Sequence, residues 1–235
     1  MSQLEVEEKF QLSASGDVEA KLKALQFVPK DTITFVDWYY DTNDNYLTTH
    51  DCWLRFREKG GKGQWQLKRG KGHTSSTVYE ETEGDDAVSL ALSMMPDTST
   101  SDARREPLKN EFEGFEAPEL PINEPNILAP FCRLETKRSS WIVDPTNECT
   151  VYEGMEVDLD STNTGHTVGE VETIVHDDLN VPDAKARVKA LIHELTEKSE
   201  DGSGVAIGKL EHFLMTYRPD HYDQCVKCGV LQKTT

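Results

Sequence analysis

Several kinds of residue or segment are scarce in this sequence, and each shortage excludes a class of protein. The five cysteines are odd in number and irregularly spaced, which does not fit the disulfide framework of a small secreted domain. No apolar run is long enough for a transmembrane helix, and the first residues lack the basic and apolar segments of a signal peptide. We therefore expect a cytoplasmic protein without a membrane partner.

Basic residues are scarce as well. The 235 residues include 25 Lys and Arg but 43 Asp and Glu, and the formal net charge is −18. Because nucleic-acid binding depends on a basic surface, we expect no nucleic-acid partner. A local cluster of cations would be informative against this acidic background. The length suits one domain and no long polar linker divides it, so we expect a single domain over residues 1–235 that acts as a monomer.

Zinc is not favoured by the cysteine pattern. Cys225 and Cys228 form a C-x-x-C pair, but no second pair and no histidines at ligand spacing accompany it. We interpret the pair as two ordinary thiols.

The pattern of apolar residues predicts an α+β fold, in which many antiparallel strands alternate with a few helices. The predicted strands cover residues 4–10, 32–40, 52–58, 64–69, 77–82, 131–143, 149–160 and 167–176. The predicted helices cover residues 17–27, 85–95 and 182–197, and two further helical segments follow residue 205.

Charged side chains gather on single faces of these strands, since successive residues of a strand point to opposite sides. The charged faces hold Glu5, Glu7 and Lys9; Trp53, Arg55 and Arg57; Gln64, Gln66 and Lys68; Tyr79, Glu81 and Glu83; Glu156, Asp158 and Asp160; and Glu170 and Glu172. Glu8 lies on the opposite face of the first strand. One such strand alone would fit the solvated side of an antiparallel sheet.

Whole strands carry one sign of charge, and this separation suggests a ligand that needs both signs. Carboxylate oxygens bind hard cations such as Mg²⁺, whereas Arg and Lys bind phosphate oxygens. A polyphosphate bound together with a divalent cation is such a ligand. If the sheet closes into a barrel, the charged face becomes its interior, and bound ions would offset the cost of burying the charges.

The same residues resemble the motifs of the CYTH superfamily, also called triphosphate tunnel metalloenzymes. The motifs are E-x-E-x-K at 5–9, R-x-R at 55–57, W-x-L-K at 65–68 and E-x-E at 170–172, with further similarity at 35–42, 136–141, 157–160, 208–210 and 217–219. The resemblance runs from residue 4 to about residue 223. It implies a closed eight-stranded antiparallel β-barrel with helices packed outside, and metal-dependent cleavage of a terminal phosphoanhydride.

The resemblance also implies roles for individual residues. The Mg²⁺ ligands would be Glu5, Glu7, Asp158, Glu170 and Glu172. The residues around the substrate would be Lys9, Arg55, Arg57, Lys68, Arg138, Lys209, Asp158, Glu170 and Glu81. The catalytic group would comprise Glu170 or Glu172, which orients the attacking water, and Lys209, with Arg138 as an alternative, at the leaving oxygen.

Aromatic residues bear on the organic end of the substrate. Trp53 resembles the family's tryptophan that stacks on a pyrimidine, and Tyr39 and Tyr79 are further candidates, although Tyr39 could equally pack in the core. The resemblance therefore implies hydrolysis of thiamine triphosphate, a small-molecule substrate, to thiamine diphosphate and phosphate. An inorganic tripolyphosphatase, an adenylyl cyclase of the same superfamily and a non-catalytic polyphosphate-binding module remain as alternatives.

Overall fold

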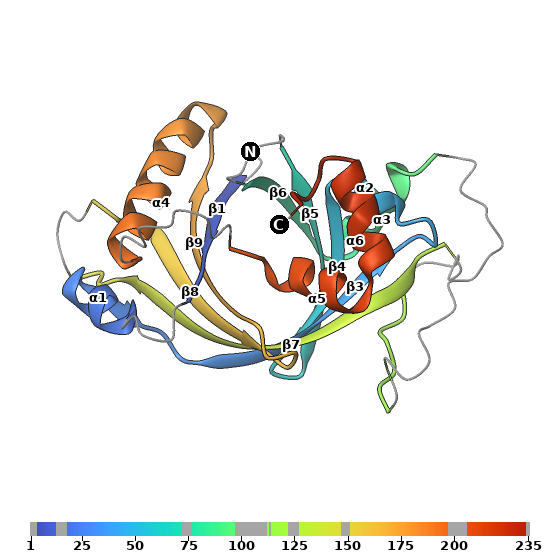
Figure 1. Cartoon of the computed structure of the whole chain (residues 1–235), viewed down its shortest axis with the longest axis horizontal. Coiled ribbons are helices and arrows are strands. Elements are labelled where there is room, and N and C mark those ends of the chain that lie inside the picture. Colours follow the sequence, from blue (N-terminus) through green and yellow to red (C-terminus); the bar gives the residue numbers. More distant parts are fainter. Residues whose placement is uncertain are drawn as a thin grey trace.

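A closed ring of antiparallel strands forms the centre of the computed structural model, which describes residues 4–12, 18–71, 77–96, 112, 114–121, 127–146, 151–196 and 206–233. The ring contains β1 (Leu4–Phe10), β3 (Ile33–Asp41), β4 (Cys52–Lys59), β5 (Lys62–Gly70), β6 (Thr77–Glu83), β7 (Ala129–Val143), β8 (Met155–Thr162) and β9 (Thr167–Val175). The strands pair in the order β7-β3-β4-β5-β6-β1-β9-β8, and β8 pairs with β7 again (Figure 1). This second pairing closes an eight-stranded barrel.

The long strand β7 makes the closure possible. Its residues 129–138 pair with β3, whereas residues 136–142 pair with β8 on the other side. The short β2 (Phe27–Pro29) pairs with the last residues of β7 beyond the end of β3. One strand therefore joins both edges of the sheet, and the joined edges expose no unpaired ladder.

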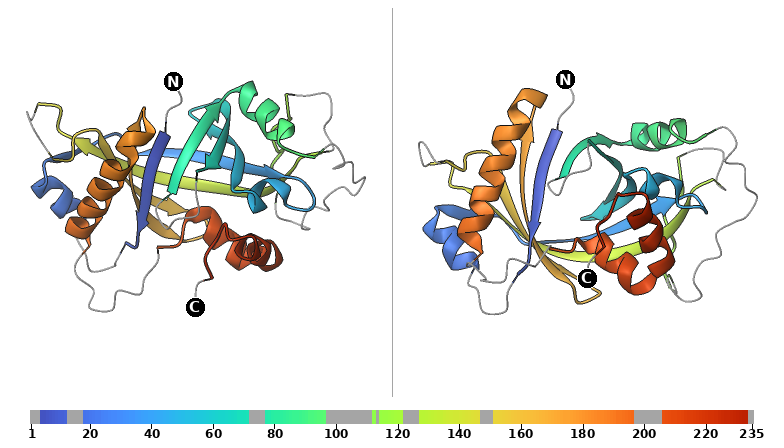
Figure 2. Two further views of the ribbon diagram at one scale, coloured as in Figure 1. Left: turned by 90° about the horizontal axis from the view of Figure 1, so that it is seen from above. Right: turned by 45° about the horizontal axis from the view of Figure 1, so that its top comes forward.

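Helices cover the outside of the barrel in separate groups (Figures 1 and 2). The helix α4 (Val181–Leu195) packs on β1 and β9, after the short 3-10 helix η1 (Asp178–Asn180), and α1 (Val18–Ala24) packs on α4 and β2. On the far side, α3 (Asp85–Ser93) packs on β4, β5 and β6. A third group contains α2 (Tyr46–Thr49), α5 (Lys209–Tyr217) and α6 (Pro219–Lys227), in which α2 contacts β3 and β4, and α5 contacts β7.

The main apolar core lies between the barrel and these helices rather than inside the barrel. Val6 and Val171 point outward from β1 and β9 and form one buried cluster with Val188 and Leu191 of α4. Glu8 also faces this side, where Lys185 and Lys189 of α4 act on its carboxylate. Because the apolar face of each strand is turned to the helices, its charged face is turned into the barrel.

The predicted α+β fold, a closed eight-stranded barrel with helices outside, is confirmed. Two predicted boundaries are wrong by three residues or more. The strand predicted over 149–160 begins at Met155, because residues 151–154 form a turn and Gly154 has a φ of 76°; residues 147–150 lie outside the described part of the chain. The helix predicted over 17–27 ends at Ala24, since Gln26 is left-handed with a φ of 67° and Phe27 starts β2.

Two further observations bear on the expectations from composition. Within the described residues, no helix has the length and apolar character needed to cross a membrane. Cys225 and Cys228 are both free thiols, the first buried and the second exposed, which fits their interpretation as ordinary cysteines.

Candidate active site

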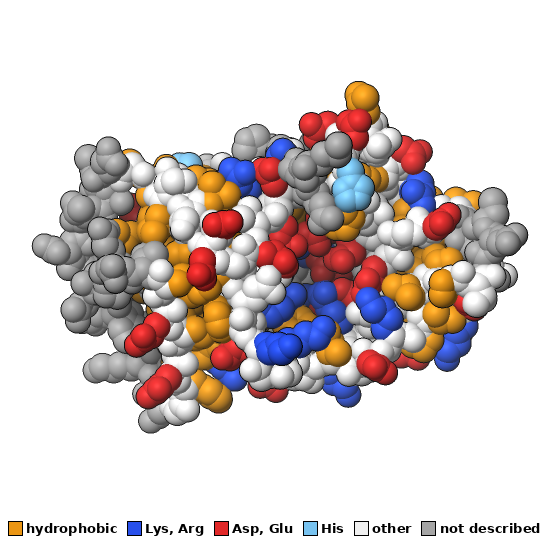
Figure 3. Space-filling view, turned by 180° about the vertical axis from the view of Figure 1, so that it is seen from behind, with side chains coloured by type: hydrophobic (Ala, Val, Ile, Leu, Met, Phe, Trp, Pro, Cys, Tyr) orange, Lys and Arg blue, Asp and Glu red, His pale blue; other side chains and the backbone are white. Residues whose placement is uncertain are grey.

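A cavity of about 520 Å³ opens inside the barrel and collects the residues predicted from the charged strand faces. The predicted residues that line it are Glu5, Glu7, Lys9, Tyr39, Trp53, Arg55, Arg57, Lys68, Tyr79, Glu81, Arg138, Glu170, Glu172 and Lys209. Asp158 does not line the cavity itself; it is 1% exposed, and its carboxylate adjoins those of Glu170 and Glu172. Figure 3 shows acidic and basic side chains gathered next to each other near the middle of one face of the molecule.

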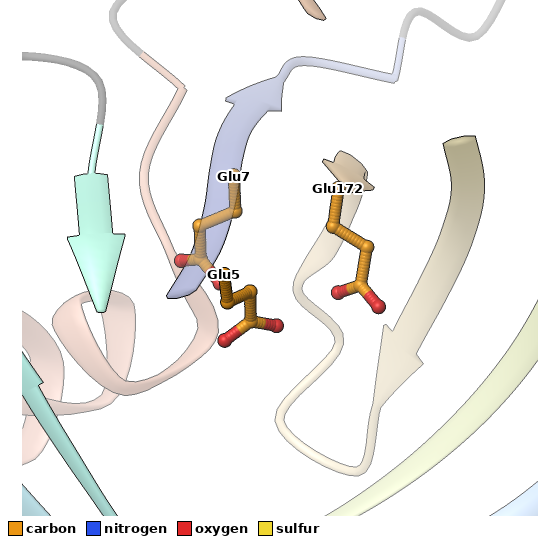
Figure 4. A group of neighbouring side chains, drawn as sticks. All are labelled: Glu5, Glu7 and Glu172. Atoms are coloured by element: carbon orange, nitrogen blue, oxygen red, sulfur yellow. The ribbon is translucent and has the colours of Figure 1, made fainter. Parts of the chain in front are cut away.

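Two groups of carboxylates stand close enough to share a cation. Glu5, Glu7 and Glu172 each offer an oxygen within 4.8 Å of the others (Figure 4), and Asp158, Glu170 and Glu172 do the same. Glu7 lies directly opposite Glu172 in the pairing of β1 with β9, and Asp158 lies opposite Glu170 in the pairing of β8 with β9. Like charges directly opposite each other destabilise a sheet, so these positions favour a compensating cation.

Lysines compensate most of this charge. The Lys9 ammonium lies 2.6 Å from a Glu7 oxygen and 3.1 Å from a Glu170 oxygen. Lys68 forms ion pairs with Glu5 and, at 3.1 Å, with Glu7. Among the described residues, Glu172 has neither a hydrogen bond nor an ion pair, although it belongs to both carboxylate groups.

The pKa shifts follow this distribution of partners. Burial raises the pKa of Glu7, but Lys68 and Lys9 outweigh it and hold the pKa below its ordinary value. Burial also raises the pKa of Glu170, but the attraction of Lys9 and Lys209 lowers it by more. The pKa of Glu170 therefore lies well below its ordinary value. At Glu172, burial and then Glu5 raise the pKa well above its ordinary value. Glu172 is therefore the carboxylate at which a bound cation would have the largest effect.

A second set of charges surrounds Arg138 on β7. Its guanidinium donates two hydrogen bonds to Asp160 at 2.8 and 2.7 Å and forms an ion pair with Asp158. Lys209, the first residue of α5, also pairs with Asp160 and lies 3.8 Å from Glu170. We did not predict Asp160 as a site residue, although it shares the strand face of Asp158 and that alternation could have indicated it.

Asp158 is held from the other side by a hydroxyl group. Ser140 Oγ donates a hydrogen bond of 2.5 Å to Asp158 Oδ1. Burial raises the pKa of Asp158 to about 6, even though Arg138 opposes the shift. A cation at this carboxylate would therefore have to compete with protons slightly below neutral pH.

The two arginines of β4 share Asp37, which lies 2.7 Å from Arg57 and 3.8 Å from Arg55, but their other partners differ. The Arg57 fork donates two hydrogen bonds of 2.7 Å to Asp37, so Arg57 is held in one orientation. Arg55 donates to Gln66 at 2.9 Å and lies 3.5 Å from Glu81. Asp37 is a further residue that we missed, and its place between Phe35 and Tyr39 on one face of β3 was the available signal.

Aromatic and apolar residues form another part of the cavity wall. Trp53 donates its indole N–H to Asp51 at 2.9 Å and leaves its ring at the cavity. Tyr79 lies beneath Lys68, whose ammonium is 5.4 Å from the ring centroid. Tyr39 lines the cavity and also packs on Phe131, with ring centroids 6.2 Å apart, so it belongs both to the cavity wall and to the core.

Other residues of the cavity wall do not belong to the charged strand faces predicted from the sequence. These are Asp51, Ala206, Gly208, Leu210, Glu211 and the segment 229–232. The last of these was not indicated by any motif, because it follows α6 and contains no charge or periodicity that points to the barrel.

Fold and cavity define a class of protein, namely closed antiparallel barrels whose charged interior can hold a polyanion together with cations. Residues 3–203 match the family model described as the CYTH domain. The chain therefore belongs to the CYTH family, and the resemblance seen in the motifs is confirmed.

Named relatives agree with this assignment. The thiamine-triphosphatases of Macaca fascicularis and Homo sapiens are each 29% identical to this chain, over 230 and 228 residues, which cover 95% of this chain and 90% of each relative. A candidate adenylate cyclase from Vibrio parahaemolyticus superposes with a TM-score of 0.51 at 18% identity, covering 83% of this chain and 90% of that one. This last likeness bears on the fold alone.

Proposed function

We propose that the chain hydrolyses thiamine triphosphate to thiamine diphosphate and phosphate with the help of Mg²⁺. The observation that carries the proposal is the position of Glu172, a carboxylate without a cationic partner among the described residues, between two carboxylate groups and beside a row of lysines and arginines. The relatives named thiamine-triphosphatase support the choice of substrate.

The donor set of the two carboxylate groups fits Mg²⁺. Both groups offer only carboxylate oxygens, which hard cations prefer, and no histidine or cysteine takes part among the described residues. Glu5, Glu7 and Glu172 would hold one cation, and Asp158 and Glu170 with Glu172 would hold a cation on the other side. When bound, the cation would neutralise the negative charge that develops on the phosphate oxygens.

The basic residues of the cavity would bind the phosphate oxygens. Lys9, Arg55, Arg57, Lys68, Arg138 and Lys209 line the cavity and are paired with carboxylates. When a triphosphate binds together with its cations, these basic groups would exchange their carboxylate partners for phosphate oxygens. Each basic group would therefore keep a negatively charged neighbour. Arg57 is the exception to this exchange: it would keep its two hydrogen bonds to Asp37, which hold it in one orientation, and would bind phosphate with its remaining N–H groups.

The reaction needs a water in line with the terminal phosphate and a stabilised leaving oxygen. We assign Glu170 or Glu172 to the orientation of that water. Lys209 lies at the start of α5, beside Asp160 and near Glu170, and would stabilise the leaving oxygen. Glu81, which neighbours Arg55, would keep that arginine oriented toward the substrate.

The organic end of the substrate would lie against the aromatic wall. Thiamine has a flat pyrimidine and a positively charged thiazolium, and both bind to aromatic faces by stacking and cation–π attraction. Trp53 and Tyr39 offer such faces at the cavity, and Tyr79 offers one below Lys68.

The remaining expectations are part of the same proposal. We propose that residues 1–235 form a single domain that acts as a monomer in the cytoplasm. The packing of α5 on β7, which brings Lys209 to the cavity, supports the inclusion of the last helices in that domain.

A substrate panel tests the proposed function. With Mg²⁺ present, kcat/KM should be highest for thiamine triphosphate, lower for inorganic tripolyphosphate and ATP, and close to zero for all three after chelation of the metal. Trp53→Ala should lower kcat/KM for thiamine triphosphate while that for tripolyphosphate stays within twofold. A higher kcat/KM for tripolyphosphate or ATP would show that the substrate is wrong.

A matched pair of variants tests the metal site. Glu170→Gln should abolish Mg²⁺-dependent turnover, whereas Glu156→Gln should retain it. Glu156 lies on β8 directly opposite Glu172 in the pairing with β9, but it pairs with Lys30 at 2.8 Å and does not line the cavity. Equal turnover in both variants would refute the assigned site.

A further inference from the structure

The segment 229–232 reaches the cavity by a sharp reversal of the chain after α6. Gly229 has a φ of 75°, a left-handed conformation that glycine adopts without strain, and the N–H groups of Val230 and Leu231 donate to the Cys225 carbonyl at 3.0 and 3.3 Å. In Figure 1 the dark red end of the chain runs from α6 to the middle of the barrel opening. All four residues of the segment line the cavity.

The segment is held in this position by defined contacts. The Tyr222 hydroxyl on α6 donates to the Gln232 carbonyl at 2.8 Å. The helix itself is fastened to the barrel region, because Arg218 Nε donates to the Phe131 carbonyl at 2.7 Å and His221 Nε2 lies 2.6 Å from Thr48 Oγ1. The segment is therefore positioned relative to β7 and α2, and its place at the cavity is built into the fold.

Leu231 extends the apolar part of the cavity wall. It packs against the buried cluster that contains Tyr39 and Phe131, and Trp53 and Leu210 pack against the same cluster. Leu231, Trp53 and Leu210 also line the same cavity, so β4, α5 and the segment 229–232 each supply an apolar side chain to its wall. The Mg²⁺-binding carboxylates proposed above come from β1, β8 and β9 instead.

We propose that the segment 229–232 is a specificity-determining wall for the organic end of the triphosphate, with Leu231 in contact with that end and Tyr222 and Gly229 as positioning residues. This inference rests on the proposed hydrolysis of a triphosphate with an organic end. A flat apolar group next to Trp53 would be covered by Leu231, whereas inorganic tripolyphosphate has no group that could use this contact. The wall therefore favours organic triphosphates through apolar contact rather than through charge.

Steady-state kinetics with two substrates tests the inference. Leu231→Ala should raise KM and lower kcat/KM for thiamine triphosphate by about tenfold, the usual effect of lost apolar contact in a pocket, while kcat/KM for tripolyphosphate stays within twofold. Tyr222→Phe removes only the hydroxyl and should raise KM for thiamine triphosphate about threefold to tenfold with kcat unchanged. It serves as the second test if Leu231→Ala folds poorly.

Two substitutions far from the cavity provide matched controls. Leu179→Ala changes a leucine that is 84% exposed in η1, and Tyr152→Phe removes a hydroxyl beside Phe27. Both should leave the two kcat/KM values unchanged, and thermal unfolding of every variant should show the same single transition as the wild type.

The outcomes separate this inference from the proposed function. If the wild-type chain does not prefer thiamine triphosphate, the proposed function fails, and the inference that rests on it falls too. If the wild type prefers thiamine triphosphate but Leu231→Ala and Tyr222→Phe affect both substrates equally or neither, only the inference is overturned. A gain of tripolyphosphate hydrolysis in Leu231→Ala would also overturn it, since the segment would then block the cavity rather than select the end group.

Discussion

Replacement of Glu172 by Gln tests the electrostatics of the cavity without a large change of shape. In each of its two carboxylate groups, Glu172 places an oxygen within 4.8 Å of the other carboxylate oxygens. Two like unit charges at that distance repel by about 3.5 kcal/mol at an effective dielectric constant of 20. The nearby Lys68 offsets a part of this repulsion, as its attraction lowers the pKa of Glu172 while burial and Glu5 raise it. We expect Glu172→Gln to be more stable than the wild type without metal at neutral pH.

The pH dependence of this gain has a definite sign. Because the pKa of Glu172 is raised well above its ordinary value of 4.5, the folded state binds more protons than the unfolded state between the two values. The stability of the wild type therefore falls as the pH rises through that window. The difference between Glu172→Gln and the wild type should be absent below about pH 4.5 and should grow above it.

Magnesium should reverse the order of stability. A ligand present at a hundred times its Kd stabilises the folded state by about 2.7 kcal/mol. With an unfolding entropy of about 2.1 cal/mol/K per residue, a chain of 235 residues would gain about 5 °C in Tm. Glu172→Gln should show a much smaller gain, since the carboxylate shared by both groups is lost.

Calorimetric unfolding between pH 4.5 and 8, with and without Mg²⁺, measures all three effects. Glu194→Gln is the matched control, because it removes an exposed carboxylate of α4 outside the cavity. The reasoning is refuted if metal-free Glu172→Gln is less stable than the wild type at neutral pH, or if its Tm rises with Mg²⁺ as much as that of the wild type.

Three other substitutions test separate parts of the structure. Asp37→Asn weakens the two 2.7 Å hydrogen bonds from Arg57 and should cost about 3 kcal/mol in urea unfolding, so an unchanged midpoint would contradict the pairing. Since burial raises the pKa of Asp158 to about 6, Mg²⁺ affinity in titration calorimetry should fall more steeply below pH 6, by up to about tenfold per pH unit from this group, and Asp158→Asn should reduce that slope. Gly169→Ala would place a Cβ 2.2 Å from the Phe10 ring and should cost about 1–3 kcal/mol; stability equal to the wild type would show that the ring moves freely.

Local patterns in the sequence predicted most of the strands and their charged faces. The alternation in β4 placed Arg55 and Arg57 on one side, and the alternation in β9 did the same for Glu170 and Glu172; the structure has all four at the cavity. The boundary errors at Met155 and near Phe27 arose at turns, where residues in unusual backbone conformations interrupt a pattern that continues on either side.

The partners of the charged residues were harder to predict. Asp37 and Asp160 each accept two hydrogen bonds from an arginine on another strand, and nothing in their own strands identifies that arginine. The segment 229–232 was missed for the same reason, because its place at the cavity depends on contacts of α6 with β7 and α2. Such contacts join residues that are far apart in the sequence.

The sequence by itself determined which side chains share a strand face, because the two-residue period of a strand is a local property. The tertiary structure alone decided that these faces close around one cavity. The pairing of β9 with both β1 and β8 brings Glu172 close to Glu7 on one side and to Asp158 on the other. Closure then requires β7 to pair with β3 and β8 at once. The sequence determines which residues are charged. The electrostatic environment of each charged residue depends on distances to other groups, and only the folded chain sets those distances.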